Sequence, residues 1–237
     1  MKLSDTMLSQ PIQLAMFDMA GTTVNDKVDG HPLMVISMIR AFAKHGIELA
    51  PDIINKHRGK QKSEAIQTLL KEAADLSPTD VERVGNSVYR DFLHELENNL
   101  SAISEIDGTT ELFRHLKSKD IYVGVGSGFP MQVVQTLVSQ LGWLDEGLLD
   151  YIGSAEQVGV GRPNPKMILD AMERLNITDG SKVLKIGDTV VDIQEGKNAG
   201  AWTVAVLTGS QTEPQLMAAG PDYILSSIRE LRMLIPR

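Results

Sequence analysis

A series of short apolar runs, each followed by a polar residue or a turn, restricts the fold of this 237-residue chain more than any other feature. Segments with helical periodicity separate these runs, which lie at residues 13–18, 121–125, 151–154, 183–186, 202–207 and 223–225. Strands that alternate with helices in this way are typical of a parallel sheet with helices on both faces. The sequence therefore predicts an α/β fold built on a doubly wound parallel sheet.

A long stretch without strand-like runs interrupts this alternation between about residues 30 and 100. Helical patterns in this stretch cover His31–Gly46, Ser63–Ala74 and Thr79–Asn98. Because the stretch follows the first predicted strand, we expect it to be a helical cap inserted above the sheet. The predicted division is a core domain of residues 1–25 and 103–237 and a cap domain of residues 26–102.

Composition and charge exclude several functional classes. The chain has no cysteine, so disulfides, a thiol nucleophile and cysteine-ligated zinc are excluded. The formal net charge is -8 and the basic residues form no dense cluster, which argues against a nucleic-acid partner. No apolar run approaches membrane-spanning length, and the N-terminal segment lacks the apolar centre of a signal peptide. We therefore expect a cytoplasmic protein with no membrane partner, and the sequence leaves open whether it forms a homodimer.

Polar residues of the right kinds for phosphorus chemistry follow several predicted strands, where open α/β sheets bind their ligands. Asp18 ends the first run, in FDMAGTT, and a carboxylate there can attack phosphorus to form an acyl phosphate. Gly21 lets the chain turn away tightly. Ser127, in VGVGSGF, and the amides after it can hold phosphoryl oxygens. Arg162, in GRPNP, supplies a fixed positive charge for the same group.

The segment IGDTVVD carries two carboxylates, Asp188 and Asp192, where a loop enters a predicted helix. Hard carboxylate oxygens are the ligands that Mg²⁺ prefers, and the ion would offset repulsion between Asp18 and an anionic phosphorus group. Taken singly, each aspartate is equally well explained as a turn residue or helix cap. Asp192 in particular either supports a metal site indirectly or only caps the helix. The joint order of these residues along the chain favours one common site.

The order DxxGT, then a strand-end serine, then a basic residue before proline, then GDTxxD resembles the haloacid dehalogenase superfamily over essentially the whole chain. The resemblance implies a Rossmann-like core with a helical cap inserted after the first motif. It also implies that Asp18 is the nucleophile and that Asp18, the Ala20 carbonyl and Asp188 bind Mg²⁺, with Asp192 behind them. The phosphate group would be bound by four residues, Thr22, Ser127, Gly128 and Arg162.

Ala20 stands where most phosphatases of this superfamily have a second aspartate, which protonates the leaving group and later activates water. An alanine there resembles the phosphonatase branch, as do the segments FDMAGTTV, GRPNPKM and IGDTVVDIQEGKNAG. That branch cleaves a carbon–phosphorus bond after a cap lysine has formed an imine with the substrate aldehyde. Lys62, in RGKQKSEAIQTLL, matches the imine lysine, and Lys60 and Lys56 are alternatives.

Several positions depart from the phosphonatase pattern. Ala65 replaces a cap histidine, Phe129 replaces a tyrosine, Arg58 replaces a methionine, and a cysteine after the first motif is absent. Three functions therefore stay open. They are a hydrolase of a small carbonyl phosphonate, a phosphomonoesterase resembling phosphoglycolate phosphatases, and a phospho-ligand binding protein without turnover. Ala20 favours the first over the second, and the intact nucleophile and metal motifs oppose the third.

Overall fold

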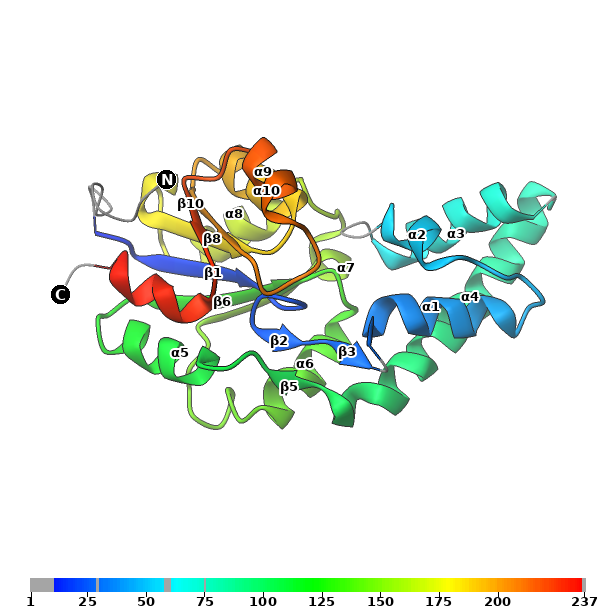
Figure 1. Cartoon of the computed structure of the whole chain (residues 1–237), viewed down its shortest axis with the longest axis horizontal. Coiled ribbons are helices and arrows are strands. Elements are labelled where there is room, and N and C mark those ends of the chain that lie inside the picture. The colour runs from blue at the N-terminus through cyan, green and yellow to red at the C-terminus, as the bar shows by residue number, and fades with distance from the viewer. Residues whose placement is uncertain (1–10, 29, 58–60, 75, 236–237) are drawn as a thin grey trace.

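The computed structural model describes residues 11–28, 30–57, 61–74 and 76–235, which form two lobes (Figure 1). The larger lobe, called the core below, contains a six-stranded sheet with the order β10-β9-β8-β1-β6-β7 in which every pair is parallel. Its strands are β1 (Leu14–Asp18), β6 (Tyr122–Ser127), β7 (Tyr151–Ser154), β8 (Val183–Gly187), β9 (Trp202–Val206) and β10 (Tyr223–Leu225). The predicted α/β class and parallel sheet are therefore confirmed.

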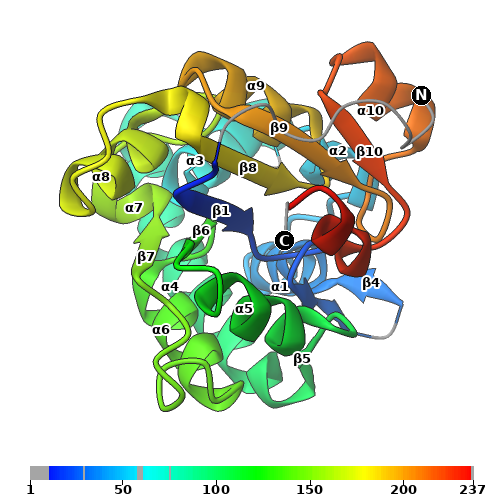
Figure 2. The same cartoon turned by 90° about the vertical axis from the view of Figure 1, so that its left-hand side faces the viewer.

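Helices cover both faces of this sheet, as Figures 1 and 2 show. The helices on one face are α5 (Thr109–Lys117) and α6 (Met131–Gln140), and those on the other are α8 (Lys166–Arg174) and α9 (Val190–Asn198). Successive side chains of a strand point to opposite faces, so Phe17 packs in one apolar cluster with Phe113 while Met16 packs in another with Met167. Burial on both faces explains why β1 reads as a continuous apolar run.

The second lobe, called the cap below, consists of helices from the segment between β1 and α5. They are α1 (Leu33–Ala43), α2 (Pro51–Asn55), α3 (Lys62–Ala73) and α4 (Pro78–Asn99). Both α1 and α3 pack against α4, and their buried side chains include Phe42, Leu69 and Phe92. Ser77 begins α4 by accepting a hydrogen bond from the Asp80 N–H, with Pro78 at the first helical position. The helices lie within the predicted cap range, whose exact boundaries stay a prediction.

The two chain segments that join the lobes pair with each other. β2 (Val24–Asn25) lies antiparallel to β5 (Ser104–Glu105), and the Ile106 N–H donates to the Thr23 carbonyl at 2.9 Å. Beside them, β3 (Lys27–Val28) pairs with β4 (His31–Pro32). The expectation of no strand between residues 30 and 100 is thus wrong at β4, because a two-residue strand is too short to give an alternating pattern.

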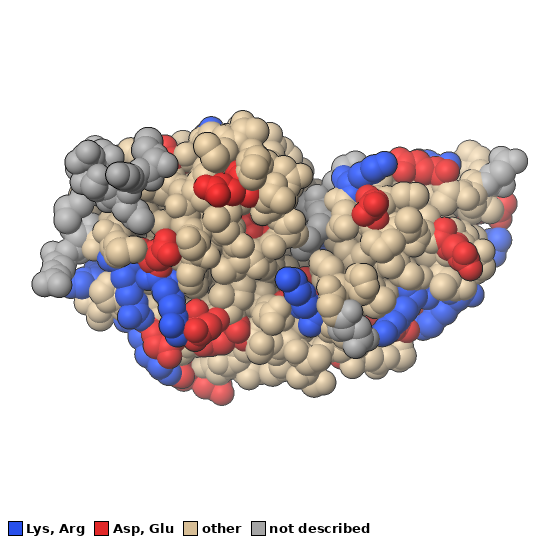
Figure 3. All heavy atoms as spheres, in the orientation of Figure 1, with Lys and Arg blue, Asp and Glu red and all other residues tan. Residues whose placement is uncertain are grey.

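The structure also contains short elements that the sequence did not predict. They include α2, described above, α7 (Ala155–Val158), α10 (Glu213–Ala218) and the 3₁₀ helices η1 (Leu100–Ala102), η2 (Gly180–Lys182) and η3 (Ile228–Met233). No helix in the described parts of the chain is long and apolar enough to cross a membrane. A space-filling view shows acidic and basic side chains on both lobes and a hollow between the lobes (Figure 3).

Candidate active site

The carboxyl ends of three neighbouring strands, β1, β6 and β8, meet on the side of the sheet that faces the cap. After β1 the chain first adds β6 on one side of β1 and later adds β8 on its other side. This edge of the sheet is therefore a topological switch point. A cavity of about 40 Å³ lies there. Its lining includes seven of the predicted site residues, Asp18, Ala20, Lys62, Ser127, Gly128, Arg162 and Asp188.

The turn after β1 contains two residues that the sequence had singled out, Gly21 and Thr22. Gly21 has φ +85°, and a Cβ at this position would lie 2.9 Å from Asp188 Oδ2, so the expected tight turn is present. Thr22 is fully buried, and its Oγ1 has no hydrogen-bond partner among the described residues. Thr22 does not line the cavity described above. The predicted contact of its side chain with phosphate therefore gains no support from its position.

Arg162 connects two of the carboxylates. Its Nη1 donates to Asp18 Oδ1 at 2.7 Å and also to Asp192 Oδ1, and the side chain is only 8% exposed. Its other terminal nitrogen, Nη2, lies near Gly128. A Cβ added at that glycine would be 3.5 Å from this nitrogen. The sequence interpretation put Arg162 at a strand end, but α7 intervenes between β7 and this residue. The loop between α7 and α8 nevertheless brings it to the strand ends.

Asp192 caps the helix, one of the two roles that the sequence left open, and also contacts two cations. Its Oδ2 accepts hydrogen bonds from the N–H, at 3.2 Å, and the hydroxyl of Thr189, which forms a capping box at the start of α9. Its Oδ1 faces Arg162 and Lys185. Although burial opposes ionisation, these two cations hold the pKa of Asp192 at about 2. Because both oxygens are already engaged, Asp192 is better suited to orient Arg162 than to bind a metal directly.

The donor atoms at the strand ends fit a hard divalent cation. Oxygens of Asp18, Asp188 and Asp192 lie within 4.8 Å of one another, and all three side chains are buried. Ser210 orients Asp188 by donating to Oδ2 from its N–H at 2.8 Å and from its hydroxyl at 3.0 Å. Burial raises the pKa of Asp18, although Arg162 acts in the opposite direction. A cation between these carboxylates would favour their ionised forms.

Ser127 and Gly128 form a turn that two cations approach. Ser127 Oγ accepts the Phe129 N–H at 3.1 Å, so its own proton is available to a phosphoryl oxygen. A Cβ at Gly128 would lie 3.3 Å from Lys62 Nζ, close to the Arg162 side chain. Lys62 begins α3 and is 6% exposed. Glycine at 128 thus leaves space where one cation from the cap and one from the core face the same point.

The three candidate lysines of the cap differ in position. Lys62 lines the cavity that contains Asp18, whereas Lys56 is exposed and lines a larger cleft. Lys60 lies outside the described residues. Ala65, at the position of the phosphonatase histidine, is buried within α3. Of the two lysines that the structure describes, only Lys62 lies at the site.

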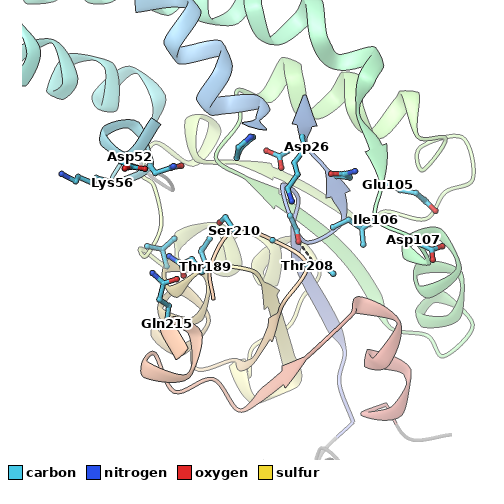
Figure 4. Close-up of a pocket in the computed structure, with 18 residues that line it drawn as sticks. Asp26, Asp52, Lys56, Glu105, Ile106, Asp107, Thr189, Thr208, Ser210 and Gln215 are labelled. Carbon is cyan, nitrogen blue, oxygen red and sulfur yellow. Dashed lines mark hydrogen bonds between the residues drawn. The ribbon is translucent and has the colours of Figure 1, made fainter. Parts of the chain in front are cut away.

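The larger cleft has a volume of about 1100 Å³ and borders the cavity, because Asp26, Thr189 and Val191 line both. Figure 4 shows Thr189 and Ser210 on the core side and Asp52 of α2 on the cap side. The cleft does not contain the carboxylate cluster, so its size alone does not identify the chemical site. Its place between the lobes gives a small polar molecule a route to the cavity.

Sequence reasoning missed several charged or polar residues of the site. Lys185 and Glu195 lie directly behind Asp192, and Asp26 lines the cavity from the segment that leads into the cap. The sequence did contain a signal for Lys185, because a lysine stands inside the apolar run VLKIGD. Glu195 follows Asp192 by three residues, which puts both on one face of α9. Nothing in the sequence around Ser210 indicated that it belongs to the site, because its loop reaches Asp188 only in the folded chain.

Comparison with known proteins identifies the family. The family description "haloacid dehalogenase-like hydrolase" matches residues 12–200. The chain belongs to this family. It is 29% identical to phosphonoacetaldehyde hydrolase of Latilactobacillus sakei subsp. sakei (strain 23K), in a match that covers 95% of this chain and 96% of that protein. The expected superfamily and the phosphonatase-like resemblance are confirmed.

Solved structures of other proteins agree with this chain in fold. A phosphonoacetaldehyde hydrolase like protein from Oleispira antarctica has a TM-score of 0.81 at 23% identity, covering 99% of this chain and 95% of that one. A predicted phosphoglycolate phosphatase from Haemophilus somnus 129PT has a TM-score of 0.80 at 18% identity, covering 96% and 100%. Membership of this hydrolase family identifies an enzyme, so the alternative of a binding protein without turnover is dropped.

Proposed function

We propose that this hydrolase cleaves the carbon–phosphorus bond of a small phosphonate that carries an aldehyde group. Asp18 is the nucleophile, and Lys62 forms an imine with the aldehyde. The observation that carries the proposal is that Asp18 and Lys62 line one cavity of about 40 Å³ in which Ala20 offers no acid for a leaving group. A leaving carbon must then be stabilised in another way, and an imine accepts the electrons of the broken bond.

The bond changes balance with one water consumed overall. The Lys62 amine adds to the aldehyde carbon, and water leaves as the imine forms. A carboxylate oxygen of Asp18 then attacks phosphorus, the carbon–phosphorus bond breaks, and its electron pair moves into the imine to give an enamine. Protonation of the carbon and hydrolysis of the resulting imine release the aldehyde and Lys62. A further water hydrolyses the acyl phosphate, which releases phosphate and Asp18.

The remaining residues of the cavity bind the charged group. Asp18, Asp188 and the Ala20 carbonyl would hold Mg²⁺, which, when bound, offsets the repulsion between the nucleophile and the phosphonate. Arg162 and the Ser127–Gly128 turn bind the phosphoryl oxygens, with donors that are already oriented before the reaction. Exclusion of water by the cap would protect the acyl phosphate until its hydrolysis.

Reductive trapping tests this function. Borohydride added with phosphonoacetaldehyde and Mg²⁺ should leave a stable adduct on Lys62, located by peptide mapping. Lys62→Arg should abolish both the adduct and the release of phosphate, because a guanidinium keeps the charge but cannot become the imine nitrogen. Lys56→Arg is the matched control and should behave like the original protein. An adduct on another lysine, or an active Lys62→Arg variant, would contradict the assignment.

A phosphomonoesterase is the second candidate, and one observation favours it. Lys62 Nζ and Arg162 Nη2 both approach the same side of Gly128, an arrangement that suits two phosphate oxygens as well as it suits an imine. In that case no adduct would form, and Lys62→Arg would retain much of its activity towards small phosphate esters such as phosphoglycolate. Parallel assays of phosphate release from phosphonoacetaldehyde and from these esters separate the two functions.

A further inference from the structure

Behind the candidate site, Lys185 of β8 and Glu195 of α9 form an ion pair that lines neither the cavity nor the cleft. Lys185 Nζ lies 3.0 Å from Glu195 Oε2, and each side chain is 1% exposed. Removing two charges from water is costly, and apolar side chains of the same volume often stabilise a protein equally well. Stability alone therefore does not account for this pair.

The pair is joined to the reacting carboxylate by a continuous set of charges. Lys185 Nζ lies 3.2 Å from Asp192 Oδ1, the oxygen that also accepts a hydrogen bond from Arg162 Nη1. That Arg162 nitrogen in turn donates to Asp18 Oδ1 at 2.7 Å. Charges of opposite sign thus alternate from Glu195 through Lys185, Asp192 and Arg162 to Asp18.

Two glycines make room for this arrangement. A Cβ at Gly187 would lie 2.3 Å from the side chain of Asp192, and a Cβ at Gly196 would lie 2.9 Å from Lys185 Cβ. Both distances are too short for any larger residue unless the backbone moves. The start of α9 therefore packs against β8 closely enough to hold Asp192 and Lys185 together.

The charges of this buried cluster balance only with a divalent cation when every carboxyl group in it is ionised. Its carboxylates are those of Asp18, Asp188, Asp192 and Glu195, and its cations are Arg162 and Lys185. When all are ionised, two negative charges are in excess, which one divalent cation would neutralise. Glu195 contributes one of these charges without lining the cavity, so it acts on the metal site through the field alone.

We propose that Lys185 and Glu195 are positioning residues, which fix Asp192 so that Arg162 presents Nη2 to the phosphoryl group, and which set the charge that attracts the metal. This inference rests on the proposed function for its metal and its phosphoryl group. Asp192 Oδ1 is shared by two cations, and Lys185 keeps that oxygen on the side of Arg162. Without this restraint the guanidinium loses the anchor that turns its other nitrogen towards Gly128.

The test uses the whole protein and two binding measurements by titration calorimetry. The probes are MgCl₂, added to metal-stripped protein, and inorganic phosphate, added to protein saturated with Mg²⁺. Glu195→Gln removes one negative charge at nearly constant volume and should weaken Mg²⁺ binding by about tenfold. Because Lys185 then loses the charged partner that holds it beside Asp192, phosphate binding should also weaken by about tenfold. Glu146→Gln is the matched control, because Glu146 pairs with Arg114 on the surface, and both affinities should stay unchanged.

A double variant, Lys185→Met with Glu195→Met, separates charge from position. It removes one charge of each sign, so Mg²⁺ affinity should return to within about threefold of the original value while phosphate binding stays weak. Thermal unfolding of each variant verifies that it is folded. Phosphate binding at the original strength in a folded double variant would overturn the positioning role, and unchanged Mg²⁺ affinity in Glu195→Gln would overturn the charge role. If the original protein bound no Mg²⁺, the proposed function would fail instead, and phosphate titrated into the metal-free variants would still decide the positioning role.

Discussion

The core and the cap hold their parts of the cavity in different ways. On the core side, Arg162 is 8% exposed and its hydrogen bonds to Asp18 and Asp192 are buried with it. On the cap side, Lys62 is also buried, at 6% exposure, but it stands at the first position of a helix, and some of the polar contacts between the lobes are exposed. One such contact joins the Tyr89 hydroxyl of α4 to Glu156 Oε1 of α7 at 3.3 Å.

This difference indicates a division of labour within the cavity. Under the proposed function, the core residues would face the phosphorus group, which every proposed substrate shares, and ion pairs among them restrict their movement. The cap side of the cavity is lined by residues such as Lys62 and Met34, which would face the carbon group attached to phosphorus. Changes in the core should therefore abolish activity towards every phosphorus substrate. Changes in the cap should act through the carbon group or through closure, as Lys62→Arg would by removing the imine.

The largest expected effect belongs to the core. Asp18→Asn keeps the size of the side chain but removes the nucleophilic carboxylate, so kcat should fall by at least about a thousandfold for every substrate. Circular dichroism and thermal unfolding should show an intact fold. Activity close to that of the original protein would remove the nucleophile assignment and the contrast between core and cap with it.

Metal removal should also act on the core alone. Dialysis against EDTA should abolish activity, and added Mg²⁺ should restore it. In calorimetric titrations, Asp188→Ala should weaken Mg²⁺ binding more than Asp192→Ala, for which a loss of roughly tenfold is expected of a residue behind the metal ligands. The reverse order would make Asp192 a ligand and Asp188 the supporting residue.

Movement of the cap is an intermediate effect. We expect residues 26–102 to close on the core when Mg²⁺ and a phosphate analogue bind, because closure would exclude water from the acyl phosphate. The chain has no cysteine, so Arg83→Cys and Arg174→Cys would provide one specific spin label on each lobe, both at exposed positions. Identical distance distributions with and without the analogue would mean that the lobes form one rigid unit.

The smallest expected effect concerns the contact between the lobes. Tyr89→Phe removes one exposed hydrogen bond to Glu156, which is worth about 0.5–1.5 kcal/mol at most. The closed form should lose population and KM should rise by less than about tenfold, with Mg²⁺ affinity unchanged. Tyr122→Phe, on an exposed side chain of β6, is the control. A large fall in kcat for Tyr89→Phe would instead assign this hydroxyl a part in the chemistry.

The sequence predicted the core better than the cap for a physical reason. Buried parallel strands produce apolar runs, and Asp18 and Ser127 occupy the last positions of such runs, so their convergence follows from the topology. Arg162 lies in a loop after a helix that the sequence did not reveal, and only its motif marked it. Thr22 also matched a motif, and its role stays a prediction, because its buried side chain is not among those that line the cavity.

Residues whose position depends on contacts between elements could not be predicted. Lys185 and Glu195 belong to different elements, and their ion pair exists only because α9 packs on β8. Asp26 lines the cavity only after the cap has folded and met the core, and Lys62, which its motif had marked, reaches the same cavity through the same contact. Periodicity describes how one segment is buried, but it contains no information on which distant segment covers it.

The pairing of β2 with β5 has a consequence for how such a protein can evolve. Because Val24 lies opposite Glu105 and Asn25 opposite Ser104, the inserted helices leave and re-enter the sheet at neighbouring points. A connector of a few residues could therefore bridge the gap, and the entropy of closing a loop changes only slowly with the length inserted between two such points. Cap modules of different sizes can be exchanged at this junction while the phosphorus chemistry of the sheet is inherited unchanged.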